Sequence, residues 1–356
     1  MGQGNIDCRH LSNTSREASH PECLSSGSNA KGRDDASLVA SRKGMPVSPK
    51  LRIMVIGAVN VDICAKPFRP LVGADSNPGR VTVSMGGVGR NIAHNLRLLG
   101  QPVSLITVFG DDSNGERIRR DLEHLGIDIS SSFTEAHRAT SSYVFITDEK
   151  GEMQLAISDM AICERMTPQI MEERLDVMNQ SCLCVIDANL PADTIHFLAE
   201  HVTVPLFADP VSTAKLHKLQ PVLSHLHTLK PNRLEAEMLT GVRIRDEASL
   251  HEAAAFLLHT GVQRVFITLG DKGVLCADQE QQQLLPPLVA DVKSTTGGGD
   301  CFLAALAYAY RMGFSLEESG SLALAAGAIC AEGEQTINEQ LSARLVHTRA
   351  GVHMPE

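Results

Sequence analysis

The sequence predicts an α/β fold in which a mostly parallel β-sheet lies between two layers of helices. Short β-branched runs alternate with longer helical ones from the start of the ordered chain, as at Arg52–Gly57, Asn91–Leu99 and Val103–Val108. Strands that alternate with helices pair in parallel and are covered by helices on both faces. Two strand-like segments, Val81–Met85 and Ser141–Ile157, break this alternation. They predict a small antiparallel sheet standing apart from the parallel one, as a lid or a dimer contact.

The bounds of the elements follow from where these runs begin and end. The first helix stops at Gly100 and the second at Gly126, because glycine readily takes the left-handed backbone that ends a helix. Asp148-Glu149-Lys150-Gly151 is a hairpin turn signal inside the second lid segment. The predicted strands of the main sheet are Arg52–Gly57, Val103–Val108, Cys182–Asp187, Pro205–Asp209, Thr228–Lys230, Val265–Thr268 and Gly273–Ala277. The predicted helices are Asn91–Leu99, Asn114–Leu125, Asp193–Glu200, Arg233–Leu239, Glu247–His259 and two near the C-terminus, the first over Cys301–Tyr310.

The first fifty residues are predicted to form a disordered tail. They are rich in Ser, Asn, Gly, Arg and Asp and have no hydrophobic period. We therefore expect one ordered domain over residues 51–356, with lid strands at about 63–85 and 140–160. A chain of 356 residues is long enough for one large α/β domain of this kind.

The composition argues against several classes of partner. A formal net charge of −10 disfavours a general nucleic-acid partner and an anionic membrane surface. No apolar run approaches the roughly 20 residues that a membrane span requires. The nine cysteines include no C-x-x-C pair, which predicts free thiols in a reducing compartment. We therefore expect a cytoplasmic protein that acts on small molecules.

The glycine turn before the Cys301–Tyr310 helix is the most informative motif. Gly297, Gly298 and Gly299 place backbone N–H groups at a helix start, where no carbonyl can accept from them, and such a turn attracts anions. Asp300 follows at once. An acid beside an anion site suits a base that takes the proton from an attacking hydroxyl, which indicates phosphoryl transfer. The alternative is that Asp300 only caps the helix. The Lys-Ser/Thr ending of a P-loop is absent.

Polar residues also follow several predicted strands. In an open parallel sheet ligands bind outside the carboxyl ends of the strands. Each of these residues could be a simple turn former or helix cap, but together they would line one edge of the sheet. They are Asp62, Asn189, Asp209, Asn232 and Asp271.

Two further motifs allow a structural and a functional interpretation. Gly86-Gly87-Val88-Gly89-Arg90-Asn91 precedes a helix and lets a ligand approach the backbone, with Asn91 able to bind sugar hydroxyls. Ile92 replaces the third glycine of the dinucleotide fingerprint, which disfavours a nicotinamide-dependent oxidoreductase. Asn232 and Glu235 form either a capping box or an outer-shell site for hydrated Mg²⁺ that also touches phosphate.

These motifs resemble, in order and spacing, those of the ribokinase-like (PfkB) carbohydrate kinases. The similarity runs from about Leu51 to Ile337 and is carried by Gly86–Gly100, Lys230–Gly241 and Ser294–Leu303. It implies a ribokinase-like three-layer αβα fold with a β lid. Further strings resemble those of family members that phosphorylate the nucleoside pseudouridine at its 5′-hydroxyl: Asp75–Gly79, Phe207–Ser212 and His227–Glu237.

The resemblance implies a role for each matching position. Asp300 would be the general base, and the amides of Gly297, Gly298 and Gly299 would stabilise charge on the transferred phosphoryl group. The ribose hydroxyls would be held by Asp62, Gly87 and Asn91. Mg²⁺ and phosphate would be organised by Asn232 and Glu235, and ATP would be bordered by Asn232, Thr268, Gly270 and Gly273.

The resemblance leaves the reading of the base open. Pseudouridine presents an N1–H where uridine has a C–H, so a buried acceptor could separate the two nucleosides. Ser142, Asp159 and Lys215 are the candidates. Ser294 stands where the family usually has an aspartate associated with a monovalent cation, which makes potassium activation doubtful. The alternatives are a kinase of another nucleoside or sugar and a nucleoside sensor without activity. A homodimer is possible.

Overall fold

The computed structural model describes residues 49–355. Residues 1–48 of the predicted tail, and Glu356, lie outside the described residues. A short 3₁₀ helix, η1 (Pro49–Leu51), leads directly into the first strand. Among the described residues no helix is long and apolar enough to cross a membrane.

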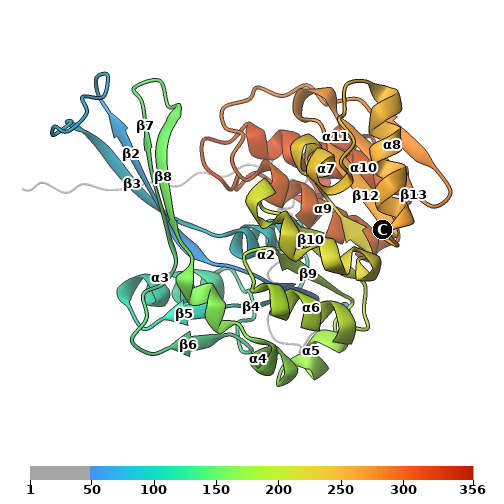
Figure 1. Cartoon of the computed structure of the whole chain (residues 1–356), viewed down its shortest axis with the longest axis horizontal. Coiled ribbons are helices and arrows are strands. Elements are labelled where there is room, and N and C mark those ends of the chain that lie inside the picture. The colour runs from blue at the N-terminus through green and yellow to red at the C-terminus, as the bar shows by residue number, and fades with distance from the viewer. Residues whose placement is uncertain (1–48, 356) are drawn as a thin grey trace, which may run out of the picture. The chain divides into compact units, whose positions relative to one another are not determined.

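The main sheet confirms the predicted parallel core. In the described residues it has eight strands in the order β14-β13-β12-β11-β10-β9-β1-β4. Neighbours from β4 to β12 run parallel, whereas β13 is antiparallel to both β12 and β14 (Figure 1). The strands are β1 (Ile53–Ile56), β4 (Val103–Ile106), β9 (Leu183–Asp187), β10 (Leu206–Asp209), β11 (Thr228–Leu229), β12 (Arg264–Thr268), β13 (Val274–Asp278) and β14 (Gln282–Leu285).

Helices cover both faces of this sheet and create two separate apolar cores. Alternate residues of β1 show the division, because Ile53 and Val55 enter one core while Met54 and Ile56 enter the other. The first core is closed by α2 (Val88–Leu98), α3 (Ser113–His124), α9 (Gly298–Met312), α10 (Leu316–Ala331) and α11 (Ala343–Ala350). The second is closed by α4 (Pro168–Glu172), α5 (Leu175–Asn179), α6 (Ala192–His201), α7 (Arg233–Thr240) and α8 (Glu247–His259).

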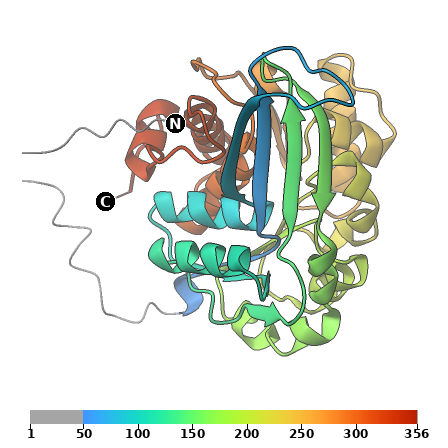
Figure 2. The same ribbon diagram turned by 90° about the vertical axis from the view of Figure 1, so that its left-hand side faces the viewer.

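The lid is a second sheet that stands away from the main one (Figures 1 and 2). Its strand order is β3-β2-β7-β8, from β2 (Asn60–Pro67), β3 (Gly79–Gly86), β7 (Ser142–Thr147) and β8 (Met153–Asp159). The pairs β2–β3 and β7–β8 are antiparallel, as predicted, whereas the central strands β2 and β7 run parallel to each other. The lid is therefore two hairpins joined side by side.

The remaining elements connect these sheets. β5 (Val108–Gly110) pairs in parallel with β6 (Phe133–Glu135) below the lid, and Thr107 separates β5 from β4. The predicted strand Val103–Val108 is thus two strands. The 3₁₀ helices are η2 (Ala161–Arg165), η3 (Thr213–Lys218), η4 (Gln220–His225) and η5 (Gly270–Lys272).

Asp62 lies elsewhere than the sequence suggested. It was expected in the turn after the first strand, but it lies inside β2, opposite Ser84 of β3 and Tyr143 of β7. The physical reason is that the segment pairs with β3 on one edge and with β7 on the other, so its backbone hydrogen bonds are made in a sheet and not in a turn. Asp62 is therefore carried by the lid sheet.

Candidate active site

The N-terminus of α9 forms an anion-binding turn. Gly297 is the N-cap residue with φ of +82°, and a Cβ at this position would collide with the carbonyl oxygen of Thr336. Only glycine fits such a position without strain. No side chain caps the helix, so the first amides of α9 point outward without an intrahelical acceptor. Together with the helix dipole they favour a bound anion.

Asp300 lies within this first turn and is held by α2. Asn91 Nδ2 donates to Asp300 Oδ2 at 2.8 Å, which joins two helices 209 residues apart in sequence. The carboxyl group of Asp300 is surrounded closely enough that burial raises its pKa well above the ordinary value, and the charge of Asp209 adds to this rise. The hydrogen bond from Asn91 acts in the opposite direction. An oriented carboxylate with a raised pKa suits a general base.

Asn91 also offers a free acceptor. Its side chain is 5% exposed, and in the part of the chain that the structure describes its Oδ1 has no hydrogen-bond partner. A buried amide oxygen without a partner costs free energy, so it fits a position that a ligand donor completes. A hydroxyl group beside Asp300 would supply that donor.

The predicted sugar-binding residues lie around the start of α2. Gly87 has φ of +101°, and a Cβ there would stand 2.5 Å from the carbonyl oxygen of Ala58, so backbone from two loops meets closely at this point. Asp62 accepts a hydrogen bond from Asn60 Nδ2 at 2.5 Å, and burial raises the pKa of its carboxyl group. Asp62 thus comes from β2, Gly87 is the N-cap of α2, and Asn91 lies in the first turn of α2.

The register of the lid separates two of the predicted base contacts from Asp62. Ser142 and Asp159 pair with each other and with Val61, so their side chains lie on the face opposite to Asp62. Their neighbours Tyr143 and Ser158 share the face of Asp62 instead. A shift of one residue exchanges the faces of a strand, and the polar character of Ser142 and Asp159 gave no sign of which face they occupy.

Lys215 lies at the carboxyl ends of β9 and β10. It belongs to η3 and donates to Asn189 Oδ1, and burial lowers the pKa of its ammonium group. Asp187, at the end of β9, is 1% exposed and accepts from the backbone N–H groups of Ala58 and Asn189 at 2.9 and 2.8 Å. Asp187 therefore ties the loop after β1 to the loop after β9. The sequence analysis did not assign it a role, although an acid that ends a buried strand is an unusual feature.

The predicted ATP-binding residues line a cavity of about 570 Å³. Thr268, Gly270 and Gly273 form one wall, and Gly298 and Gly299 of the anion-binding turn form another. The cavity therefore ends at Asp300's helix. Apolar side chains that the sequence analysis missed complete it: Leu288, Val289, Val292, Phe302 and Leu324. Asn232 does not line this cavity.

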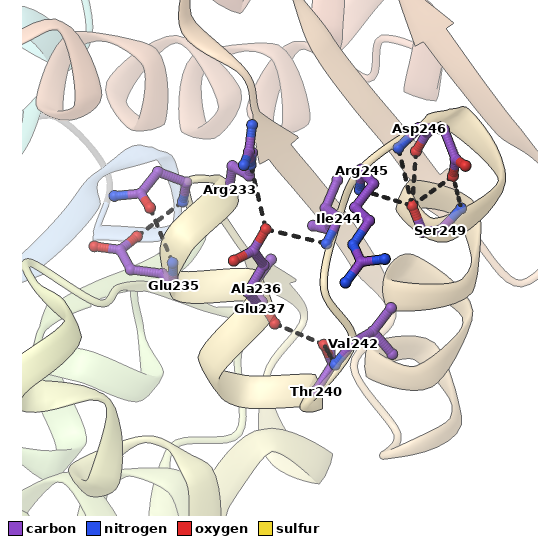
Figure 3. A network of polar contacts seen from close by, with 11 residues as sticks. Arg233, Glu235, Ala236, Glu237, Thr240, Val242, Ile244, Arg245, Asp246 and Ser249 are labelled. Carbon is purple, nitrogen blue, oxygen red and sulfur yellow. Dashed lines mark hydrogen bonds and ion pairs between the residues drawn. The ribbon is translucent and has the colours of Figure 1, made fainter.

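Asn232 and Glu235 form the capping box at the start of α7. Glu235 N donates to Asn232 Oδ1 at 2.9 Å, and Asn232 N donates to Glu235 Oε2 at 2.8 Å. Figure 3 shows Glu235 and its hydrogen bonds at the start of α7. The structural interpretation is therefore realised. Glu235 Oε1 takes no part in the box; Asn232 is exposed, whereas Glu235 is only 3% exposed. Among residues 49–355 no group of three or more His, Cys, Asp or Glu could hold a metal directly.

One charged residue of the site escaped the sequence analysis altogether. Lys230, directly after β11, is 5% exposed, and its Nζ lies 3.4 Å from Asp209 Oδ2. In the sequence Lys230 is only the last residue of the predicted strand Thr228–Lys230, and nothing local indicates that it is buried. A buried lysine is rare enough to mark a functional site once its burial is known.

Comparisons with known proteins agree with this geometry. Residues 50–343 match the family described as pfkB family carbohydrate kinase. The chain is 34% identical over 307 residues to an uncharacterized sugar kinase, YeiI, of Escherichia coli K12, which covers 85% of this chain and 84% of that protein. It is 32% identical over 292 residues to the pseudouridine kinase of the same strain, with 82% and 93% covered. The fold matches that of ribokinase from Thermotoga maritima with a TM-score of 0.77 at 23% identity, covering 85% of this chain and 99% of that one.

Proposed function

Because the chain belongs to the pfkB family of carbohydrate kinases, we propose that it transfers the γ-phosphoryl group of ATP to the 5′-hydroxyl of pseudouridine. Family membership makes the chain a sugar or nucleoside kinase, a phosphotransferase with an alcohol acceptor. The observation that carries the proposal is the Asn91–Asp300 pair at the free amides of α9. This pair brings together the carboxylate of Asp300 as a base, the unpaired Oδ1 of Asn91 as an acceptor for a substrate hydroxyl, and the anion-binding turn.

The residues divide the reaction between them as follows. Asp300 takes the proton of the 5′-hydroxyl, and the freed oxygen attacks the γ-phosphorus of ATP. The bond from phosphorus to the β,γ-bridging oxygen breaks, and ADP leaves with the electron pair. The amides of Gly297, Gly298 and Gly299 donate to the phosphoryl oxygens as charge redistributes. Positioning and charge stabilisation account for most of the catalysis, since phosphoryl transfer needs little covalent help.

The nucleotide and its metal would bind next to this turn. ATP would occupy the cavity bordered by Thr268, Gly270 and Gly273, with its phosphates toward Gly298 and Gly299. Glu235 and Asn232 would hold Mg²⁺ through water, which suits a cation that keeps much of its hydration shell. When bound, Mg²⁺ neutralises phosphate charge. Ser294 N donates to the carbonyl oxygen of Ala331. That a monovalent cation has no clear role near Ser294 stays a prediction.

The choice of nucleoside rests on the lid and on the ends of β9 and β10. Asp62 and Asn91 would hold the ribose, which leaves the base between Tyr143 of the lid and Lys215 with Asn189. The ammonium group of Lys215 suits a pyrimidine carbonyl oxygen, and the hydroxyl of Ser158 can accept a hydrogen bond from a donor such as N1–H. The similarity to pseudouridine kinase supports this substrate over ribose alone.

An assay of ADP formation with Mg²⁺ tests the proposal. Pseudouridine, uridine, adenosine and ribose are offered separately, with Asp300→Asn as the control that should not turn over. Turnover with pseudouridine far above that with uridine is expected. Turnover with another acceptor would retain the kinase and overturn the substrate. Binding of nucleosides without any turnover would favour a sensor.

The lid face opposite to Asp62 is an exposed apolar surface through which two copies of the chain could pair. Val81, Val83, Leu155 and Ile157 lie on the face opposite to Asp62 and are between 48% and 64% exposed. Aliphatic side chains in paired rows on one sheet face are unusual on a free surface. We therefore expect two copies of the chain to pair through this face, which light scattering can measure.

A further inference from the structure

Lys230 is a buried cation beside the anion-binding turn to which the reaction described above gives no role. It follows β11 directly, at the same sheet edge as Asp187 and Asp209. Pro231 comes next and Asn232 caps α7, so the backbone on the C-terminal side of Lys230 is fixed. The side chain is 6% exposed. Burying a flexible, charged chain at the carboxyl edge of the sheet is costly unless the charge is used.

The ammonium group of Lys230 is paired with one acid. Its Nζ lies 3.4 Å from Asp209 Oδ2, its one ion pair among the described residues. An ammonium group has three N–H donors, and one distant carboxylate does not satisfy them all. Two donors remain for another acceptor.

The same ammonium group lies against the anion-binding turn. A Cβ placed on Gly299 would stand 3.2 Å from Lys230 Nζ, so the cation is close to the second residue of α9. Gly299 also lines the proposed ATP cavity. The ammonium group of Lys230, which follows β11, and the free amides of α9 therefore lie next to the same part of the cavity. A phosphate at the amides would meet the cation as well.

We propose that Lys230 is a further catalytic residue, whose ammonium group binds the γ-phosphoryl group of ATP during its transfer to the acceptor hydroxyl. The inference rests on the proposed function of this site. While the oxygen of the acceptor forms its bond to phosphorus and the bond to ADP breaks, charge spreads over the phosphoryl oxygens and the departing oxygen. A cation fixed in place before the reaction stabilises that charge without reorganisation. The proton of the acceptor goes to Asp300.

Lys230 would also assist the base. The charged groups facing Asp300 are Asp209 from β10, Asp187 from β9 and Lys230 from β11. The two acids favour the protonated form of Asp300, whereas the ammonium group favours the ionised form that accepts a proton. Removing the cation should therefore move the acid limb of the pH–kcat/KM profile to higher pH.

The alternative is that Lys230 only closes a buried ion pair between β10 and β11. The test compares Lys230→Met with Lys218→Met, because Lys218 is also partly buried and donates to a backbone carbonyl, that of Leu190, at 2.8 Å. For Lys230→Met we expect kcat to fall about 100-fold, the loss typical of one removed transition-state donor, with the acceptor KM unchanged. Lys218→Met should behave as the wild type. Methylamine or ethylamine should restore part of the activity of Lys230→Ala.

Nucleotide binding provides a second readout that does not depend on the acceptor. By calorimetry, Lys230→Met should weaken ATP binding at least tenfold more than ADP binding, because only ATP carries the group that Lys230 contacts. Should Lys230→Met leave Asp209 unpaired and fail to fold, the double variant Lys230→Met/Asp209→Asn removes both charges and is measured instead.

The outcomes separate this inference from the proposed function. A wild type that phosphorylates a different sugar overturns the substrate, and Lys230 is then tested on that sugar. If the wild type turns over no acceptor, the proposed function fails and the ATP-against-ADP comparison still decides the role of Lys230. A folded variant with wild-type kcat, or one that weakens ATP and ADP equally, overturns the role of Lys230.

Discussion

Replacing Asp300 with Asn separates the catalytic and structural roles of this carboxylate. The amide has nearly the same shape, and its oxygen can still accept the hydrogen bond that Asn91 Nδ2 donates at 2.8 Å. The substitution therefore removes the base and leaves the contact between α2 and α9. Positioned general bases contribute typically 10²- to 10⁴-fold to rate, so we expect kcat to fall by about that factor.

The same change should make the fold more stable above neutral pH. Burial, with the charge of Asp209, raises the pKa of Asp300 in the folded chain, so the ionised form destabilises the fold. This cost is absent below the pKa of the unfolded chain and complete above that of the folded one. Each unit of difference is worth about 1.4 kcal/mol, reduced here because the group is partly exposed. Asn carries no charge and avoids the cost.

The assay for Asp300→Asn combines turnover with thermal unfolding. ADP formation reports kcat, nucleoside binding is followed by calorimetry, and melting is recorded at pH 5 and pH 8. We expect lost turnover, nearly unchanged nucleoside affinity, and a gain in melting temperature that is larger at pH 8. Turnover close to that of the wild type would refute the assignment of the base. Equal gains at both pH values would refute the electrostatic explanation.

Three further predictions concern the ATP cavity, the lid and the core. Gly273→Ala should raise the KM for ATP and lower the melting temperature, because φ is +92° and a Cβ would collide with the carbonyl oxygen of Leu285; normal ATP kinetics would contradict this. Ile157→Lys should turn a dimer into a monomer in light scattering, whereas an unchanged mass would reject pairing through the lid. Burial lowers the pKa of His227 to about 4 in the folded chain. Between about pH 4 and pH 6.5 the imidazole is therefore protonated in the unfolded chain and neutral in the folded one. The free energy of unfolding should therefore decrease as the pH is lowered from about 6.5 to about 4, by up to about 1 kcal/mol per pH unit. His227→Phe should lose this part of the pH dependence in urea titrations.

The sequence predicted the parallel core well because that part of the fold depends on local signals. Glu247–His259 has the same bounds as α8, and the glycines at 100 and 126 follow α2 and α3 closely. Asp300 and Asn91 could be predicted as partners only through the resemblance to a family. Nothing local says that two residues 209 positions apart share a hydrogen bond. That contact follows from how α2 and α9 pack on one face of the sheet.

The errors and omissions arise where burial and register decide. Asp62 lies inside β2, because pairing on both sides makes a strand of a segment that looks like a turn. Ser142 and Asp159 face away from Asp62 because the side chains of a strand alternate. Lys230 could not be singled out from composition, since its importance comes from its burial against Gly299 and Asp209. Each depends on tertiary placement that periodicity does not contain.

The position of the transferred phosphate tests the central claim most directly. The protein is incubated with pseudouridine, Mg²⁺ and ATP labelled in the γ-phosphoryl group, and the product is identified by mass spectrometry and by phosphorus–proton couplings in NMR. The account predicts one labelled product with the phosphate on the 5′ oxygen, and none with Asp300→Asn. Label on another hydroxyl, or only in inorganic phosphate, would contradict the arrangement of base, acceptor and anion-binding turn described here.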